Sequence, residues 1–335
     1  MADEDFADSS EHGRTLEEQA RHEEGIRQLV VAARTNFLAY LHLFNPQGAA
    51  EYIISDVHRR LIQLVQDVAD GRADPNTAIS MPPQHGKSTL LSKEAPSWIL
   101  GRQPGINVAI TGHSFDLVTD FSKWVRDRVN TEQYQQVFPN SRTRRGSDKM
   151  DIWEMENGSG MVAKSAGSKL IGRRVDWLVC DDVHPGRAEA ESPTMRQKVI
   201  DWYYADCMTR MHPQGKIFLI GTRWHPNDLI GHLTSDEQVD QIRVEEEEIR
   251  KDEPEYRTRI FNVVRFSAIA EEGEEDPLGR EPGAALFPQE RPRSFLLAQK
   301  AILPSYEWDS LFQQNPRSAS SGQADLSRII YVEKN

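Results

Sequence analysis

A segment in the first third of the chain combines glycine, lysine and hydroxyl side chains in a spacing suited to phosphate. MPPQHGKST, at positions 81–89, fits the pattern G-x-x-x-x-G-K-[S/T] at its last glycine, lysine and serine, whereas Met81 replaces the first glycine. In such a loop the lysine, here Lys87, reaches the β- and γ-phosphates of ATP, and the hydroxyl of Ser88 binds Mg²⁺. The segment therefore predicts a nucleotide-binding loop.

The two prolines of this segment do not exclude the site. Pro82 and Pro83 lack N–H groups, but the backbone donors that hold phosphate come from the last half of the loop, where a helix begins. A chance match in a surface turn is the alternative, and the apolar run Thr77–Met81 before the loop argues against it. The predicted nucleotide-binding residues are Gln84, His85, Gly86, Lys87, Ser88 and Thr89.

A pair of carboxylates follows another apolar run. VDWLVCDDV, at positions 175–183, places Asp181 and Asp182 after four apolar residues. Hydrolysis of a nucleotide needs one carboxylate near Mg²⁺ and a second that orients the attacking water. We assign Asp181 to Mg²⁺ and Asp182 to the water, although many such enzymes place the longer Glu second. Two solvated aspartates that open a loop are the alternative.

A third apolar run ends in a hydroxyl side chain. IFLIGTRW, at positions 217–224, predicts a strand that ends at Gly221 and Thr222. Beside a γ-phosphate, the Thr222 hydroxyl would sense hydrolysis. An ordinary turn after the strand explains the same spacing.

The elements that position these residues are of two kinds. Short apolar runs alternate with helical patterns such as the one at 114–129, and the runs lie at 77–81, 106–111, 177–180 and 217–221. This alternation is typical of a mainly parallel sheet covered by helices on both faces, so the predicted fold class is α/β. Helical spacing also covers 29–44 and 51–70, whereas the first twenty-five or so residues are polar and predicted to be loose.

The character of the chain changes after about Val244. A charged helix, a strand at Phe261–Ile269, a loop rich in Pro and Gly, and a helical stretch at Phe295–Asn315 follow in turn. We interpret this part as a smaller lid or linker subdomain.

The net charge of −12 argues against a protein that coats nucleic acid tightly. Basic residues nevertheless concentrate in SRTRRGSDK, at positions 141–149, and weak DNA contacts are predicted at Arg142, Arg144, Arg145 and Lys149.

No apolar run approaches the ~20 residues of a membrane span, and the N-terminus has no signal-peptide pattern. Cys180 and Cys207 form neither a disulfide framework nor a zinc cluster, which fits a reducing cytoplasm.

These segments, in this order and spacing, resemble the large terminase subunits of tailed phages and prophages. The resemblance covers about residues 51–316, and GTRWHPNDLIG is its most specific part. The matching segments are MPPQHGKST, LVCDDV, IFLIGTRWHPNDLIG, PSWILGR, SFDLVTDFSKWVRDRV, DPLGREPG and LFQQNP.

The resemblance implies a P-loop NTPase of the additional-strand, RecA-like type. It also implies an ATP- and Mg²⁺-dependent motor that assembles as a ring, usually a pentamer, on the portal protein of a procapsid. Such a motor works with the small terminase subunit and pumps double-stranded DNA in the host bacterial cytoplasm. The expected domains are an N-terminal acidic and helical arm (1–45), an ATPase core (46–260) and a lid or linker (261–335).

The resemblance also concerns residues outside the core motifs. Family members carry a C-terminal nuclease, which we expect to be absent here, because only Asp325 and Glu333 supply carboxylates after Pro316. Family members also use an arginine to stabilise the γ-phosphate, delivered in some of them by the neighbouring subunit. The resemblance implies that Arg173 or Arg174 has this role. DNA contact or a solvated loop is the alternative for this pair. Tyr52 and His58 are candidates for adenine contacts.

Other classes of protein remain open. A P-loop kinase would share GKST but would not explain GTRWHPNDLIG or the paired aspartates. A helicase-like ATPase would need further nucleic-acid motifs, which the sequence does not show. A portal-docking adaptor without turnover would not need Lys87, Ser88, Asp181 and Asp182 together.

Overall fold

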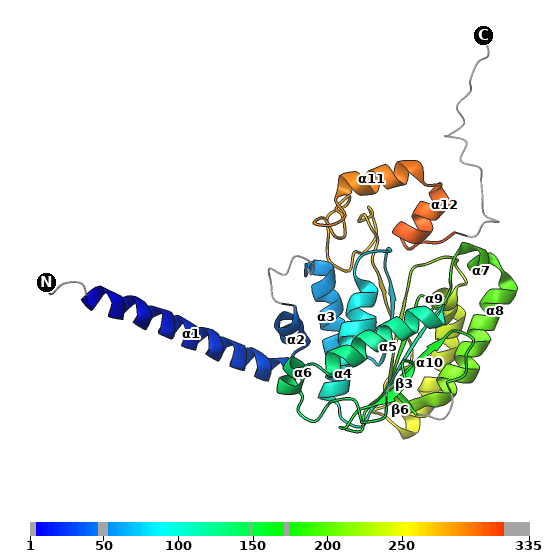
Figure 1. The fold of residues 1–335 in the computed structure, drawn as a ribbon. Coiled ribbons are helices and arrows are strands. Elements are labelled where there is room, and N and C mark those ends of the chain that lie inside the picture. The colour runs from blue at the N-terminus through cyan, green and yellow to red at the C-terminus, as the bar shows by residue number, and fades with distance from the viewer. Residues whose placement is uncertain (1–4, 46–52, 148, 171–173, 318–335) are drawn as a thin grey trace, which may run out of the picture. The chain divides into compact units, whose positions relative to one another are not determined.

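The computed structural model describes residues 5–45, 53–147, 149–170 and 174–317, with side chains described from Glu18 onward (Figure 1). Its helices are α1 (Asp5–Ala33), α2 (Phe37–Phe44), α3 (Asp56–Ala69), η1 (Thr89–Glu94), α4 (Ala95–Arg102), α5 (Phe115–Val129), α6 (Glu132–Val137), α7 (Arg187–Glu191), α8 (Pro193–Trp202), η2 (Tyr203–Cys207), η3 (Met208–Arg210), α9 (Leu229–Leu233), α10 (Asp236–Asp252), α11 (Arg293–Ile302), α12 (Ser305–Glu307) and η4 (Trp308–Phe312). Its strands are β1 (Asn76–Ser80), β2 (Asn107–Gly112), β3 (Ile152–Glu154), β4 (Gly160–Ser165), β5 (Val175–Asp181), β6 (Met211–Gly221) and β7 (Asn262–Arg265).

The strands form a seven-stranded sheet in the order β3-β4-β2-β5-β6-β1-β7. Strand β1 runs parallel to both of its neighbours, β5 runs parallel to β6, and β3 and β4 pair antiparallel. One strand, β6, therefore lies between the strand that precedes the phosphate loop and the strand that ends in the aspartates. The predicted α/β class and additional-strand arrangement are confirmed.

The chain forms two compact units. The first contains the described residues of Met1–Ala73, Ser88–Val108 and Thr119–Ala163, and the second contains those of Asp74–Lys87, Ala109–Val118 and Lys164–Asn335. In the second unit every residue of β1 and of β5 is buried, as expected for strands covered on both faces.

Aromatic side chains form the core of the first unit. The ring of Phe37 stacks on that of Trp98, with 5.1 Å between their centroids, and the Tyr40 hydroxyl hydrogen-bonds the Ser97 hydroxyl at 2.7 Å. Trp98 donates its indole N–H to the carbonyl of Ala33 at 3.0 Å. These contacts fix α2 and the end of α1 against α4, the helix that continues from the phosphate loop.

The N-terminal segment differs from its prediction. It was expected to be loose, but α1 begins at Asp5 and continues to Ala33. No proline precedes Pro46, and Glu24 pairs with Arg27 and Gln28, three and four residues on, which stabilises a helix even where its surface is polar. The predicted helical stretch 29–44 is divided after Ala33, because the Asn36 side chain accepts the N–H of Ala39 and starts α2.

The segment after β7, which the sequence predicts to be a lid or linker, has a small core of its own. After β7, backbone hydrogen bonds join Leu286 to Ala268 and Ala270 to Ala284, each at 2.9 Å. The buried cluster beneath this ladder contains Ala268, Ala285, Leu296 and Trp308, with Ile269, Leu303 and Phe312 packed against it. The predicted strand at Phe261–Ile269 is shorter in the structure, where β7 covers Asn262–Arg265.

Candidate nucleotide site

The phosphate loop follows the buried strand β1 and ends where helical residues begin at Lys87. Gly86 has a φ of 80° and Gln84 one of 58°, so the loop uses the left-handed region at two positions. Only glycine adopts that region without cost, and a non-glycine residue held there is a feature of functional sites. Met81, which replaces the first glycine of the pattern, is fully buried and donates its N–H to the carbonyl of Gly221 at 3.1 Å.

Lys87 lies where the three predicted motifs meet. Its Nζ is 2.8 Å from Asp182 Oδ2 and donates to Thr222 Oγ1 at 3.0 Å. The lysine is 6% exposed, so its charge is partnered within the protein rather than by bulk water. The structure thus brings together the lysine of the loop, the second aspartate and the hydroxyl after β6.

Asp182 is fixed from several sides. Its Oδ1 accepts the N–H of Thr222 at 2.8 Å, and its own N–H donates to the carbonyl of Ile220 at 2.9 Å. His113 hydrogen-bonds the Asp182 carbonyl at 3.0 Å. With a φ of 46°, Asp182 is strained, and the surrounding hydrogen bonds hold it there.

Asp181 and Ser88 carry oxygen donors of the type that Mg²⁺ prefers. Asp181 ends β5 and is 1% exposed; a Cβ on Gly112 would lie 2.9 Å from its carbonyl oxygen, so glycine is needed on the neighbouring strand. Ser88 is half-buried and Thr89 is exposed at the start of the helix. In the described part of the chain, no group of three or more His, Cys, Asp or Glu side chains is arranged to hold a metal ion. A nucleotide site needs no such group, because Mg²⁺ there is bound by one or two carboxylates and by substrate phosphates.

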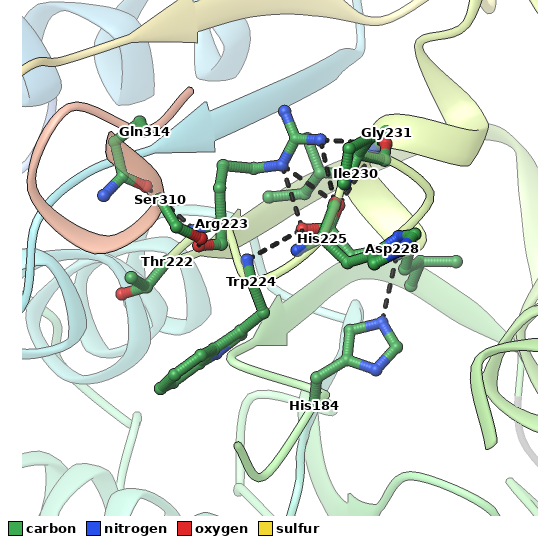
Figure 2. A network of polar contacts seen from close by, with 12 residues as sticks. His184, Thr222, Arg223, Trp224, His225, Asp228, Ile230, Gly231, Ser310 and Gln314 are labelled. Carbon is green, nitrogen blue, oxygen red and sulfur yellow. Dashed lines mark hydrogen bonds and ion pairs between the residues drawn. The ribbon is translucent and has the colours of Figure 1, made fainter. Parts of the chain in front are cut away.

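The GTRWHPNDLIG segment folds around Asp228, as Figure 2 shows. Both carboxylate oxygens of this aspartate accept Arg223 Nε at 3.0 Å, and they also accept the N–H groups of Trp224 at 3.1 Å and Gly231 at 2.9 Å. Asp228 is 2% exposed. A Cβ on Gly231 would lie 1.7 Å from the carbonyl oxygen of Pro226, so only glycine fits at the end of this motif.

The C-terminal segment holds the backbone next to Thr222 (Figure 2). Gln314 accepts the N–H of Arg223 at 2.9 Å through Oε1, and the Ser310 hydroxyl donates to the Arg223 carbonyl at 2.7 Å. Ser310 and Gln314 are each 1% exposed. LFQQNP was noted in the sequence without a role. This segment contains two buried glutamines, and Gln314 holds the residue after Thr222. The sequence did not predict that role.

The family model described as "Terminase large subunit, T4likevirus-type, N-terminal" matches residues 78–284. This range includes the phosphate loop, both aspartates and the whole GTRWHPNDLIG segment. The chain belongs to the large terminase subunits. The resemblance inferred from the motifs is confirmed.

Comparison with solved structures finds other phage large terminases. A mutant ATPase domain from Thermus phage P74-26 has a TM-score of 0.47 and 15% identity, over 75% of this chain and 93% of that one. The large terminase of a thermophilic bacteriophage, in complex with ADP, has a TM-score of 0.43 and 9% identity, over 76% of this chain and 52% of that one. The terminase chain therefore spans about half the length of that protein. Comparison with curated proteins gives no match.

The candidates for adenine contacts and for the γ-phosphate arginine are not found beside the phosphate loop in the described part of this terminase. Tyr52 and Arg173 lie outside the described residues. His58 is 5% exposed and accepts the N–H of Ser55 at 3.2 Å, so it caps α3. Arg174 pairs with Asp176 at 3.2 Å at the beginning of β5. At a rise of ~3.3 Å per residue, the beginning of this strand lies about 20 Å from its end at Asp181.

The basic loop of the terminase is exposed. The side chains of Arg142, Arg144, Arg145 and Lys149 all face solvent. Arg144 pairs with Glu154 at 2.6 Å, whereas Arg142 and Arg145 have no carboxylate within ion-pair distance in the described part of the chain. In the described residues, no helix has both the length and the apolar character that crossing a bilayer requires.

His184 follows the aspartate pair and supports the GTRWHPNDLIG segment. Its Nε2 accepts the N–H of Leu229 at 3.0 Å, which requires that this nitrogen carry no proton. Burial lowers the pKa of His184 below its ordinary value; the nearby Asp228 opposes this shift and Arg196 adds to it. The neutral imidazole is therefore part of the folded site.

Proposed function

We propose that this chain is the ATP-hydrolysing motor domain of a terminase and drives double-stranded DNA into a phage procapsid. The observation that carries the proposal is the position of Lys87, whose Nζ contacts Asp182 at 2.8 Å and Thr222 at 3.0 Å. A structural adaptor has no need for a buried lysine shared between a strained aspartate and a threonine. Membership of the large terminase family gives this chemistry its context.

Each side chain then has a role in hydrolysis. The backbone of residues 84–89 and Lys87 bind the phosphates of ATP, and Ser88 and Asp181 hold Mg²⁺, which neutralises phosphate charge when bound. Asp182 orients the attacking water, and Lys87 holds that carboxylate in place. Thr222 responds to the loss of the γ-phosphate, because its hydroxyl already bonds the lysine that binds this group.

The motor works as an assembly. We propose a homo-oligomeric ring, in pentameric form on the portal protein, which works with the small terminase subunit in the host bacterial cytoplasm. DNA contacts are weak and come from the exposed Arg142, Arg144, Arg145 and Lys149.

Arg173 or Arg174 stabilises the γ-phosphate in the transition state and acts in trans in this proposal. Arg174 precedes β5, whereas Lys87 contacts Asp182 at the opposite end of that strand, so Arg174 does not serve its own site. An Arg173→Ala/Arg174→Ala double variant retains Lys87, and a Lys87→Ala variant retains the arginines. Each alone has little turnover, and a mixture regains activity at interfaces where one subunit donates arginine to the other's intact site. Failure of every mixing ratio to restore turnover contradicts a trans arginine.

Steady-state ATP hydrolysis by the purified chain tests the function itself. We expect Mg²⁺-dependent turnover that rises with protein concentration or when DNA and procapsids gather subunits. An adaptor gives no turnover under any of these conditions. A helicase-like ATPase instead separates the strands of a partial duplex, which a packaging motor does not do.

A further inference from the structure

A turn in the lid contacts the phosphate loop. The guanidinium of Arg291 donates through Nη2 to Oε1 of Gln84, and the ring of Phe287 lies 6.4 Å from the ring of His85. The turn is closed by its own backbone, because the Arg291 N–H donates to the Phe287 carbonyl at 2.7 Å. Two consecutive residues of the loop therefore meet two residues of one lid turn.

The position of this turn is set by the strand that carries the loop. Strand β7 pairs in parallel with β1, and the N–H of Phe266 donates to the carbonyl of Ser80 at 2.9 Å. The chain then folds back, and Leu286 donates to Ala268 at 2.9 Å. A continuous backbone ladder thus leads from the end of β1 to the turn, so Arg291 is placed by the sheet and not by a loose loop.

Arg291 differs from Arg223 and Arg280 in its partners. Arg223 pairs with Asp228, and Arg280 pairs with Asp276 at 2.7 Å. In the described part of the chain no carboxylate lies within ion-pair distance of Arg291; it bonds the neutral amide of Gln84 and lies over the ring of Phe295. Its positive charge is therefore not neutralised by the lid.

The phosphate loop has need of such a charge. The charge of Lys87 is shared with Asp182. A nucleoside triphosphate brings more negative charge than one lysine balances. Gln84, exposed and at a φ of 58°, holds the guanidinium beside the middle of the loop.

We propose that Arg291 binds the γ-phosphate of ATP in cis, with Gln84 as the residue that positions it. This inference rests on the proposed function, because it assumes that the loop binds ATP. The guanidinium presents planar, bidentate donors suited to phosphate oxygens. Its hydrogen bond to a charged phosphate oxygen is stronger than its hydrogen bond to the neutral amide oxygen of Gln84. ADP lacks that acceptor. Arg291 therefore distinguishes the two nucleotides.

The test is a comparison of binding affinities, measured by calorimetry with ATPγS and with ADP in the presence of Mg²⁺. In Arg291→Ala the affinity for ATPγS falls about 10- to 100-fold, the range for a lost hydrogen bond to a charged group, and the affinity for ADP stays within about twofold. Arg293→Ala is the matched control: this arginine lies two residues further on, bonds the Gly283 carbonyl at 3.0 Å, and leaves both affinities unchanged. Arg291→Gln, which keeps a polar chain without the charge, gives the same selective loss and replaces the alanine variant if that one fails to fold.

Other outcomes overturn the inference. If Arg291→Ala loses affinity for both nucleotides equally, the residue only packs against the loop. If it loses affinity for neither, the side chain does not contact the nucleotide. A wild-type chain that binds neither nucleotide overturns the proposed function and this inference together. The inference alone is overturned if the wild-type chain binds both nucleotides, Lys87→Ala abolishes this binding, and Arg291→Ala leaves the ratio of the ATPγS and ADP affinities unchanged.

Discussion

Lys87 and Asp182 form an ion pair beneath the phosphate loop, with 2.8 Å between Nζ and Oδ2 and 7% of the lysine side chain exposed. The same carboxylate accepts the N–H of Thr222 through its other oxygen. Because both oxygens are engaged, the carboxylate has one orientation before any substrate arrives. Preorganised charge of this kind lowers a barrier at no cost of reorganisation during the reaction.

Substitution of either partner should abolish ATP turnover in different ways. Lys87→Ala removes the phosphate-binding charge, so both nucleotide binding and turnover are lost. Asp182→Asn keeps an oxygen that can accept the Thr222 N–H, so nucleotide binding survives while turnover falls about 100-fold or more. Turnover and nucleotide affinity measured side by side separate the two effects. Lys251→Ala, on the exposed face of α10, is the control, and unimpaired turnover in Lys87→Ala contradicts the assignment.

Thr222 is expected to act through its hydroxyl. Thr222→Val keeps the shape of the side chain but removes the oxygen that accepts Lys87 Nζ, and we expect turnover to fall about tenfold or more with little change in ATP affinity. Thr222→Ser retains the hydroxyl and most of the activity. Equal turnover in the valine variant and the wild type would show that this position is an ordinary turn after β6.

Stability should decline on mild acidification because of His184. Burial lowers the pKa of this imidazole in the folded protein below its ordinary value of 6.5, so the unfolded chain binds the proton more readily. The stabilisation is complete above about pH 6.5 and is lost as the pH falls through the folded-state pKa, with a slope of at most about 1.4 kcal/mol per pH unit for one proton. Burial also lowers the pKa of His225, which adds to the trend.

Chemical denaturation at a series of pH values between 5 and 8 measures this slope. His184→Gln offers an uncharged acceptor to the Leu229 N–H and should flatten the decline, whereas His22→Gln, on the exposed surface of α1, should not. A decline of the same size in His184→Gln would assign it to other groups.

DNA binding should be weak, independent of sequence and strongly dependent on salt. Replacement of Arg142, Arg144 and Arg145 together should reduce the slope of log K against log salt by about 2–3 units, because each contacted phosphate contributes about 0.9. The lower figure applies if Arg144 remains paired with Glu154. Fluorescence anisotropy with a random duplex gives the slope, and an unchanged value would mean that the basic loop makes no phosphate contact.

The sequence by itself determined the local parts of this terminase. The order of strand, phosphate loop and helix at 76–102 follows from one apolar run, one glycine and one helical pattern that are adjacent in the chain. The aspartates at the end of β5 follow in the same way from four apolar residues and a change to charge. Each of these signals lies within a few residues, where backbone geometry and side-chain period act directly. The family followed because its motifs are local as well.

Only the tertiary structure decided which of these parts meet. Lys87 and Thr222 are 135 positions apart, and Arg223 and Gln314 are 91 apart, and no periodicity links such distances. The same packing made His58 a helix cap and placed Arg174 at the far end of β5 from Lys87. It also brought Arg291 to the phosphate loop, which no motif suggested. Contacts of this kind depend on strand order and on the fold of the lid, because they form only after the sheet has brought distant segments together.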